Sequence, residues 1–263
     1  MTLTKNQIMD IRHFIVAGHA FTVNLPDNDA GIALPSYEPF SVAADEGREQ
    51  LFTLTVDDGF YPSEKGALIG EFDCGAADFG VYRLADGTYQ MLISPPGGKY
   101  CGLLQASADF REGTIATRGE DAWRTFAVNN ALMLVYAFAA ATHDTLLVHA
   151  SVIKKQCFGY LFLGKSGTGK STHTRLWLEH ILGSSLLNDD NPIVRVVGEE
   201  VIAYGSPWSG KTPCYKQERY ELKGCVRLSQ APYNQIEKLP ILQGRKSALS
   251  ILKATSRNWR IWG

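Results

Sequence analysis

The segment from Gly164 to Thr172 contains the pattern G-x-x-x-x-G-K-[ST], directly after the apolar run from Tyr160 to Leu163. Glycines at these positions let backbone N–H groups turn toward phosphate oxygens, and the positive end of a following helix adds to the attraction. We expect Lys170 to reach the β- and γ-phosphates of a nucleotide and Ser171 to bind Mg²⁺. The pattern therefore predicts a phosphate-binding P-loop, whose residues are Gly164, Ser166, Gly167, Thr168, Gly169, Lys170, Ser171 and Thr172.

The residues on both sides of this segment have the types that a P-loop requires. An apolar strand-like run precedes it, and Leu178, Ile181 and Leu182 follow at helical spacing. The alternative is a Gly-rich turn that matches by accident, which at background glycine content is about a one-in-a-hundred event in a chain of this length. The strand, loop and helix order favours the nucleotide site over the accidental turn.

Paired acids form the second chemical feature. Asp189 and Asp190 follow a short apolar run, about 20 positions after Lys170. A carboxylate there can hold Mg²⁺ or accept a proton from an attacking hydroxyl, which are the two tasks that phosphoryl transfer leaves to side chains. The alternative is a solvated turn, because Asn-Asp-Asp-Asn-Pro is also good turn chemistry.

A loop lysine, Lys211, is a candidate for extra positive charge near a transferring phosphoryl group. Gly205 and Gly210 flank its loop and give the backbone freedom to approach a ligand. The alternative is an exposed lysine without a role in the chemistry. We retain Lys211 as a candidate catalytic residue.

Composition sets limits on the partners. The chain has 263 residues, of which 45% are hydrophobic and 20% charged, enough for one large core or two small ones. Lys and Arg number 26 against 27 Asp and Glu. A balance so close to neutral does not indicate nucleic acid or an anionic membrane as a partner. A nucleotide requires only local positive charge.

Cysteine usage and apolar segments bear on location. The cysteines are odd in number and never in C-x-x-C spacing, which argues against a disulfide framework and against a zinc site. They are Cys74, Cys101, Cys157, Cys214 and Cys225. The longest apolar stretch, 131–141, is well short of the ~20 residues that span a bilayer, and the N-terminus shows no signal-peptide pattern. We expect a cytoplasmic protein.

Residues 1–118 are expected to form a β-rich N-terminal domain whose role the sequence does not indicate. Segments with alternating polarity lie between Gly, Pro, Asp and Asn residues, as strands usually do. The clearest hairpin pairs 81–84 with 88–93, because Asp86 and Gly87 supply the backbone conformation of a tight turn.

Residues 119–263 are expected to form the domain that holds the P-loop. An apolar segment rich in helix formers follows two acidic residues and predicts a helix from Asp121 to about Ala141. Strands are expected at 146–153 and 158–163, a hairpin at 193–197 and 201–204, and a short amphipathic helix at 246–253.

These motifs resemble the superfamily of HPr kinase/phosphorylase and phosphoenolpyruvate carboxykinase. The resemblance rests on the P-loop, on the preceding strand with His149, and on the acids Asp189 and Asp190 that follow so soon. The later run from Tyr204 to Lys211 is similar to HPr-kinase-related proteins, some of which lie beside peptide-modification genes. The resemblance covers residues 146 to 230. It implies an α+β or α/β fold in which a β-rich domain precedes a P-loop kinase domain with a mixed sheet.

The resemblance also implies residue roles, with ATP and Mg²⁺ as cofactors. Lys170 would contact the phosphates, and Ser171 and Asp190 would hold the metal. Either Asp189 or Asp190 would act as the general base, and this choice stays open. His149 resembles the histidine that lies beside the acid pair in HPr kinases, and its alternative is a core histidine on a strand.

Two departures narrow the implied function. Thr172 stands where HPr kinases have a glutamate, and the second HPr kinase signature is absent, so HPr is not an indicated substrate. Residues that would bind oxaloacetate are not recognisable. We expect a kinase that moves the ATP γ-phosphate to a hydroxyl of a protein, a peptide or a small molecule, plausibly a serine. A carboxykinase-like enzyme on a small carboxylate and a nucleotide-binding regulator without transfer activity are the alternatives.

Overall fold

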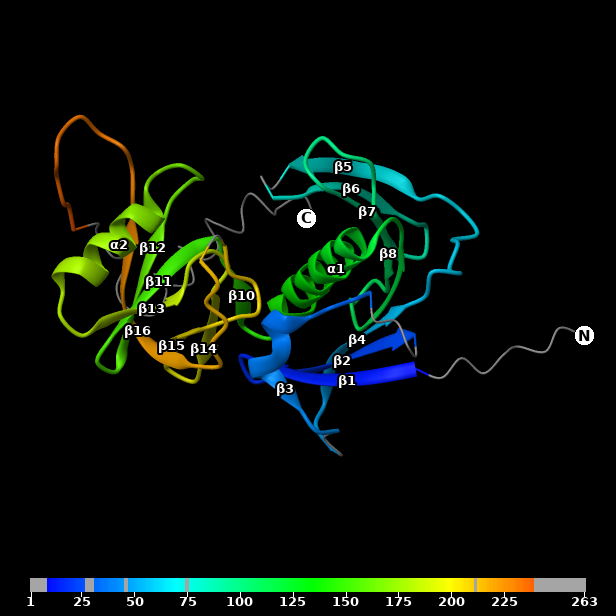
Figure 1. The fold of residues 1–263 in the computed structure, drawn as a ribbon, viewed down its shortest axis with the longest axis horizontal. Helices are drawn as coiled ribbons and strands as arrows, with labels where there is room; N and C mark the ends of the chain where they lie inside the picture. Colours follow the sequence, from blue (N-terminus) through cyan, green and yellow to red (C-terminus); the bar gives the residue numbers. More distant parts are fainter. Residues whose placement is uncertain (1–8, 27–30, 45–46, 74–75, 211, 239–263) are drawn as a thin grey trace, which may run out of the picture. The chain divides into compact units, whose positions relative to one another are not determined.

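The computed structural model describes residues 9–26, 31–44, 47–73, 76–210 and 212–238. The protein is mixed α/β and consists mostly of strands. It divides into two compact units, Met1–Thr142 and His143–Gly263, and each unit holds one mixed sheet (Figure 1). The expected α+β or α/β class is confirmed at this level.

The first unit holds a nine-stranded sheet in the order β3-β1-β2-β4-β9-β8-β7-β6-β5. Strand β4 is parallel to both of its neighbours, and all other neighbouring strands are antiparallel. The expected hairpin is β6 and β7, which confirms the prediction from Asp86 and Gly87. The elements are β1 (Met9–Val16), β2 (His19–Pro26), the 3₁₀ helix η1 (Pro35–Phe40), β3 (Ser41–Val42), β4 (Gln50–Val56), β5 (Ala67–Asp73), β6 (Asp78–Arg83), β7 (Tyr89–Ser94), β8 (Gly102–Ala106) and β9 (Glu112–Thr117).

Helix α1 (Asp121–Ala141) begins and ends where the sequence predicts. It packs on β4, β7, β8 and β9, and the sheet curves around it (Figure 1). The hydroxyl of Tyr136, which is fully buried, donates to the carbonyl of Val16 at 3.0 Å. The helix thus completes the core of the first unit. The structure divides after Thr142, whereas the sequence suggested a boundary before residue 119, because the apolar residues of α1 bury against this sheet.

The second unit holds a seven-stranded sheet in the order β10-β14-β15-β16-β12-β11-β13. Among the strands that the structure describes in this sheet, β12 and β16 are parallel to each other and the other neighbours are antiparallel. The hairpin expected at 193–204 is confirmed as β14 and β15. The elements are β10 (Thr145–Leu147), β11 (Ala150–Lys155), β12 (Phe158–Leu163), α2 (Lys170–His180), β13 (Ser184–Asn188), β14 (Ile193–Val197), β15 (Glu200–Tyr204) and β16 (Arg219–Arg227).

Alternation along β12 separates the two faces of this sheet. Tyr160 and Phe162 contact the ring of Trp177 on α2. Leu161 and Leu163 point the other way into a buried apolar cluster that also contains Val152. Helix α2, which follows the glycine-rich loop, is therefore anchored to β12, which precedes that loop.

The prediction of a single strand at 146–153 is wrong. The segment forms two strands, since β10 pairs with β14 whereas β11 pairs with β12 and β13. At the break, the N–H groups of Val148 and Ala150 donate to the carbonyls of Pro192 and Asp190. These bonds draw His149 to the loop that carries the acids.

The helix expected at 246–253 lies outside the described residues. Among the residues that the structure describes, no helix is both long enough and apolar enough to cross a membrane.

Candidate functional site

The loop between β12 and α2 has the backbone that a phosphate cradle requires. Gly167 and Gly169 adopt φ angles of 80° and 95°, in the left-handed region that favours glycine. At Gly164 a Cβ atom would lie 2.3 Å from Oγ1 of Thr168, so only glycine fits there. The Thr168 hydroxyl donates to the carbonyl of Lys165 at 2.8 Å, which holds the loop in its curled form.

The N-terminus of α2 offers a positive helix end. Its N-cap is Gly169, which supplies no capping side chain, and the first turn contains no acidic residue. The first N–H groups of a helix lack intrahelical partners, and the helix dipole places partial positive charge there. The described residues therefore fit a bound phosphate at this position.

Lys170 lies across the loop and is 7% exposed. Its Nζ donates to the carbonyls of Gly164 at 2.9 Å and Lys165 at 3.3 Å, and it lies 3.0 Å from Nε2 of His149. Burial lowers the pKa of Lys170, while the negative charges of Asp190 and Asp189 act in the opposite direction. A buried ammonium with only carbonyl and imidazole partners fits the added negative charge of a nucleotide phosphate.

His149 links this lysine to the acid pair. Its Nδ1 lies 2.9 Å from Oδ1 of Asp190, and the other oxygen of Asp190 accepts from the amide of Asn191 at 3.0 Å. A neutral imidazole can donate through Nδ1 and accept from Lys170 through Nε2, so this tautomer satisfies both contacts. Lys170, His149 and Asp190 thus form a continuous chain of contacts.

Asn188 orients the acid pair and was not singled out from the sequence. Its side chain is fully buried, and Oδ1 accepts the backbone N–H groups of Asp190 and Asn191, each at 2.9 Å. Its Nδ2 donates to Oγ of Ser206 at 3.0 Å and to the carbonyl of Trp208 at 3.3 Å. An Asn before two acids is an Asx-turn signal that could have identified this anchor.

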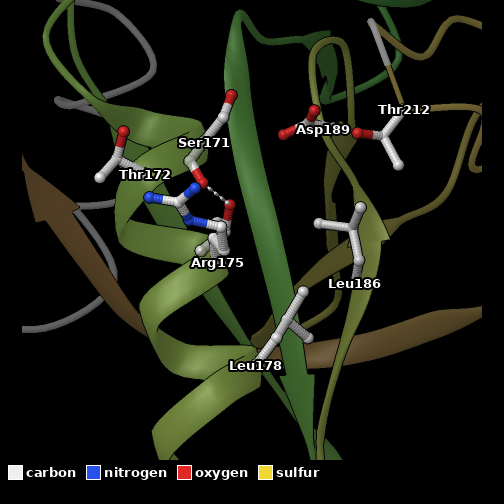
Figure 2. Close-up of a pocket in the computed structure, with 8 residues that line it drawn as sticks. Ser171, Thr172, Arg175, Leu178, Leu186, Asp189 and Thr212 are labelled. Carbon is white, nitrogen blue, oxygen red and sulfur yellow. Dashed lines mark hydrogen bonds between the residues drawn. The ribbon is translucent and has the colours of Figure 1, made fainter.

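Asp189 contacts different groups from Asp190. Its Oδ1 accepts from the hydroxyl of Ser151 at 3.2 Å, a second contact that sequence reasoning missed. Asp189 also lines a pocket of about 360 Å³ beside α2, opposite Ser171 in the close-up (Figure 2). The pocket is lined by Ser171, Thr172, Thr174, Arg175, Leu178, Leu186, Asp189 and Thr212.

The structure brings most of the predicted site residues together. Lys170, His149 and Asp190 are in direct contact, and Ser171 and Asp189 border the same pocket. Ser166 and Thr172 lie exposed on the loop and on the first turn of α2.

Lys211 lies outside the described residues. Its neighbour Gly210 packs so closely on Asp190 that a Cβ at this position would lie 3.0 Å from the Cβ of Asp190.

Neither the models of known protein families nor the curated proteins show a match to this sequence.

Proposed function

We propose that this protein is an ATP-dependent kinase of the HPr kinase-like type, which transfers the γ-phosphate to a hydroxyl group. The observation that carries the proposal is the contact chain Lys170, His149 and Asp190, with Asp189 beside it on an open pocket. A phosphate cradle, a buried lysine and two carboxylates are the parts that phosphoryl transfer requires of a protein.

The two acids have different surroundings, and these support different roles. Both oxygens of Asp190 already accept hydrogen bonds, from His149 and Asn191, so its position is firmly determined. Asp189 borders the pocket, where a second substrate can reach it. We therefore assign Asp189 as the general base and Asp190 as the carboxylate on the metal side.

Ser171 and Asp190 would hold Mg²⁺, which supplies charge neutralisation on the phosphate oxygens. Asp189 would accept the proton of the acceptor hydroxyl as its oxygen bonds to the γ-phosphorus. The bond from the γ-phosphorus to the oxygen bridging the β- and γ-phosphates breaks, and ADP leaves with that electron pair. Lys170 and the N–H groups of the loop stabilise the charge that develops on the phosphates.

The described cysteines Cys101, Cys157, Cys214 and Cys225 are free thiols, which supports our proposal of a reducing, cytoplasmic location.

The test is incubation of the purified protein with γ-labelled ATP, Mg²⁺ and a lysate of its own host. We expect label on a host polypeptide or small molecule, and loss of that label in Lys170→Ala. Asp189→Asn should retain ATP binding without transfer. Binding of ATP without any acceptor-dependent label would contradict the kinase proposal.

A further inference from the structure

We propose that the pocket beside Asp189 is the acceptor subsite, and that it selects a hydroxyl compound that also carries an anionic group and a short apolar part. The inference rests on the proposed function, because only phosphoryl transfer would make the bound compound an acceptor. The ligand preference of the pocket can be measured without any transfer. The occupant is a small molecule or a short exposed peptide segment.

The pocket runs along α2 away from the P-loop. Ser171, Arg175 and Leu178 all line it, and seven helical residues rise about 10 Å at 1.5 Å each. In the close-up, Asp189 lies across from Ser171, whereas Leu178 and Leu186 lie toward the other end (Figure 2). A ligand in this pocket can place a hydroxyl at Asp189 while its remainder extends along the helix.

The strand order supports an acceptor rather than the nucleoside in this pocket. The acids follow β13, on one side of β12, whereas β16 lies on the other side. The segment after β16 touches the P-loop, because Gln230 donates to the carbonyl of Gly167 at 3.0 Å. The pocket therefore lies on the side of β12 where the proposed general base is, and the segment after β16 covers the loop on the other side.

Charge determines where an anionic group would bind. Asp189 repels a second negative charge at its own end of the pocket. Arg175 provides positive charge farther along α2. Its side chain is 68% exposed, and Nε lies 3.7 Å from Oε1 of Glu179. Such a surface pair is weak, and a guanidinium binds carboxylate or phosphate with two parallel hydrogen bonds. An acceptor with an anion next to its hydroxyl group fits both residues.

The far end of the pocket favours an apolar group. Leu178 is 43% exposed, and Leu186 is partly buried. Covering such side chains removes apolar surface from water, which favours binding. A volume of about 360 Å³ is at the small end of ligand pockets, so the occupant is a compact molecule or a few residues of a peptide.

The ligand preference can be tested without any transfer step. The probes are acetyl-Ala-Glu-Leu-amide and acetyl-Ala-Gln-Leu-amide, in which Ala takes the position of the hydroxyl residue and which differ only in one carboxylate. They are titrated calorimetrically into the full chain with Mg²⁺ and a non-hydrolysable ATP analogue. We expect the acidic peptide to bind at least tenfold more tightly, and Arg175→Gln to abolish this preference.

The matched control is Arg219→Gln, which removes an exposed arginine outside the pocket and should retain the preference. The apolar end is tested with acetyl-Ala-Glu-Gly-amide, which should bind at least fivefold more weakly than the acidic leucine peptide, with the difference lost in Leu178→Ser. Equal or undetectable binding of the two leucine peptides, or an unchanged preference in Arg175→Gln, would overturn the proposal.

The corresponding serine peptides, assayed with γ-labelled ATP, separate this inference from the proposed function. If the acidic peptide binds more tightly than the neutral one but no phosphoserine forms, the result supports the subsite and contradicts the kinase proposal for such acceptors. Phosphoserine formed equally on the acidic and neutral peptides supports the kinase and overturns the charge selection by Arg175.

Discussion

Nδ1 of His149 lies 2.9 Å from Oδ1 of Asp190. The opposite nitrogen of the same ring lies 3.0 Å from Nζ of Lys170, so one imidazole connects Lys170 to Asp190. A neutral ring serves both partners, whereas a protonated ring would direct an N–H toward the lysine ammonium. In the proposed mechanism, His149 is therefore a positioning residue between Lys170 and Asp190.

Replacing the two acids separately should give different kinetic defects. Asp189→Asn should lower the transfer rate by about 10²-fold or more, because a general base typically contributes 10² to 10⁴. Its affinity for Mg·ATP should stay within about threefold, because Asp189 is assigned to the acceptor side. Asp190→Asn should lower both the transfer rate and the affinity for Mg·ATP. Calorimetry and single-turnover assays measure the two quantities.

The reverse pattern would exchange the roles. If Asp189→Asn weakens Mg·ATP binding while Asp190→Asn leaves it intact, then Asp189 is the metal-side carboxylate and Asp190 is not.

The buried charge of Lys170 should reduce the stability of the nucleotide-free protein near neutral pH. Burial lowers the pKa of Lys170 in the folded state, so the unfolded chain binds more protons between that lowered pKa and the ordinary value of 10.5. The free energy of unfolding therefore rises with pH in this window. Lys170→Met removes the buried charge, and its melting temperature should exceed that of the wild type by a few degrees at pH 7, with the difference shrinking toward pH 10.5.

Lys154→Met is the matched control with the opposite sign. Hydrogen bonds to Glu218 and then Tyr220 raise the pKa of Lys154, so its contribution stabilises the protein at pH 7 and is lost as the pH rises past 10.5 through the folded-state pKa. Lys154→Met should melt below the wild type at pH 7. Thermal melts of the wild type and both variants across this pH range measure these differences in stability. A Lys170→Met protein that is less stable than the wild type at pH 7 would refute the argument that burial of the Lys170 charge is destabilising.

Gly169→Ala should impair both stability and nucleotide binding. An alanine at φ 95° costs about 1–2 kcal/mol, because the left-handed region crowds Cβ against the backbone. Gly183→Ala is a control with a similar φ of 80° outside the P-loop, and a Cβ there meets no atom within 4 Å. Denaturant unfolding should show similar losses in the two variants, but only Gly169→Ala should bind Mg·ATP more weakly. Equal ATP affinity in both would show that the loop conformation does not depend on Gly169.

Asn188→Ala should destabilise the second unit by about 2–3 kcal/mol, because it leaves the backbone N–H groups of Asp190 and Asn191 without their buried acceptor. Asn191→Ala removes one half-buried hydrogen bond to Asp190 and should cost less than about 1 kcal/mol. Urea unfolding followed by circular dichroism compares the two. Similar losses would mean that Asn188 does not anchor the acid loop.

Local patterns predicted the elements that depend on neighbouring residues. Helix α1 was placed correctly because a long apolar segment follows acids that suit a helix start. The strand at 158–163 also matched, and the helix after the glycine-rich loop begins near the predicted residue. It ends at His180, so Ile181 and Leu182 lie beyond it, and Leu182 is 97% exposed instead of part of an apolar helix face. The prediction of a single strand at 146–153 was wrong because β10 pairs with β14, far along the chain, whereas β11 pairs with the adjacent β12.

By itself the sequence determined the glycine-rich pattern, its lysine and the two acids, since these are residue types at short spacing. Only the tertiary structure decided which groups meet: Lys170 with His149, His149 with Asp190, and Asp189 with the pocket along α2. It also placed α1 with the first sheet. The physical reason is that long-range strand pairing and burial bring these groups together, and neither is encoded in the spacing of any one segment.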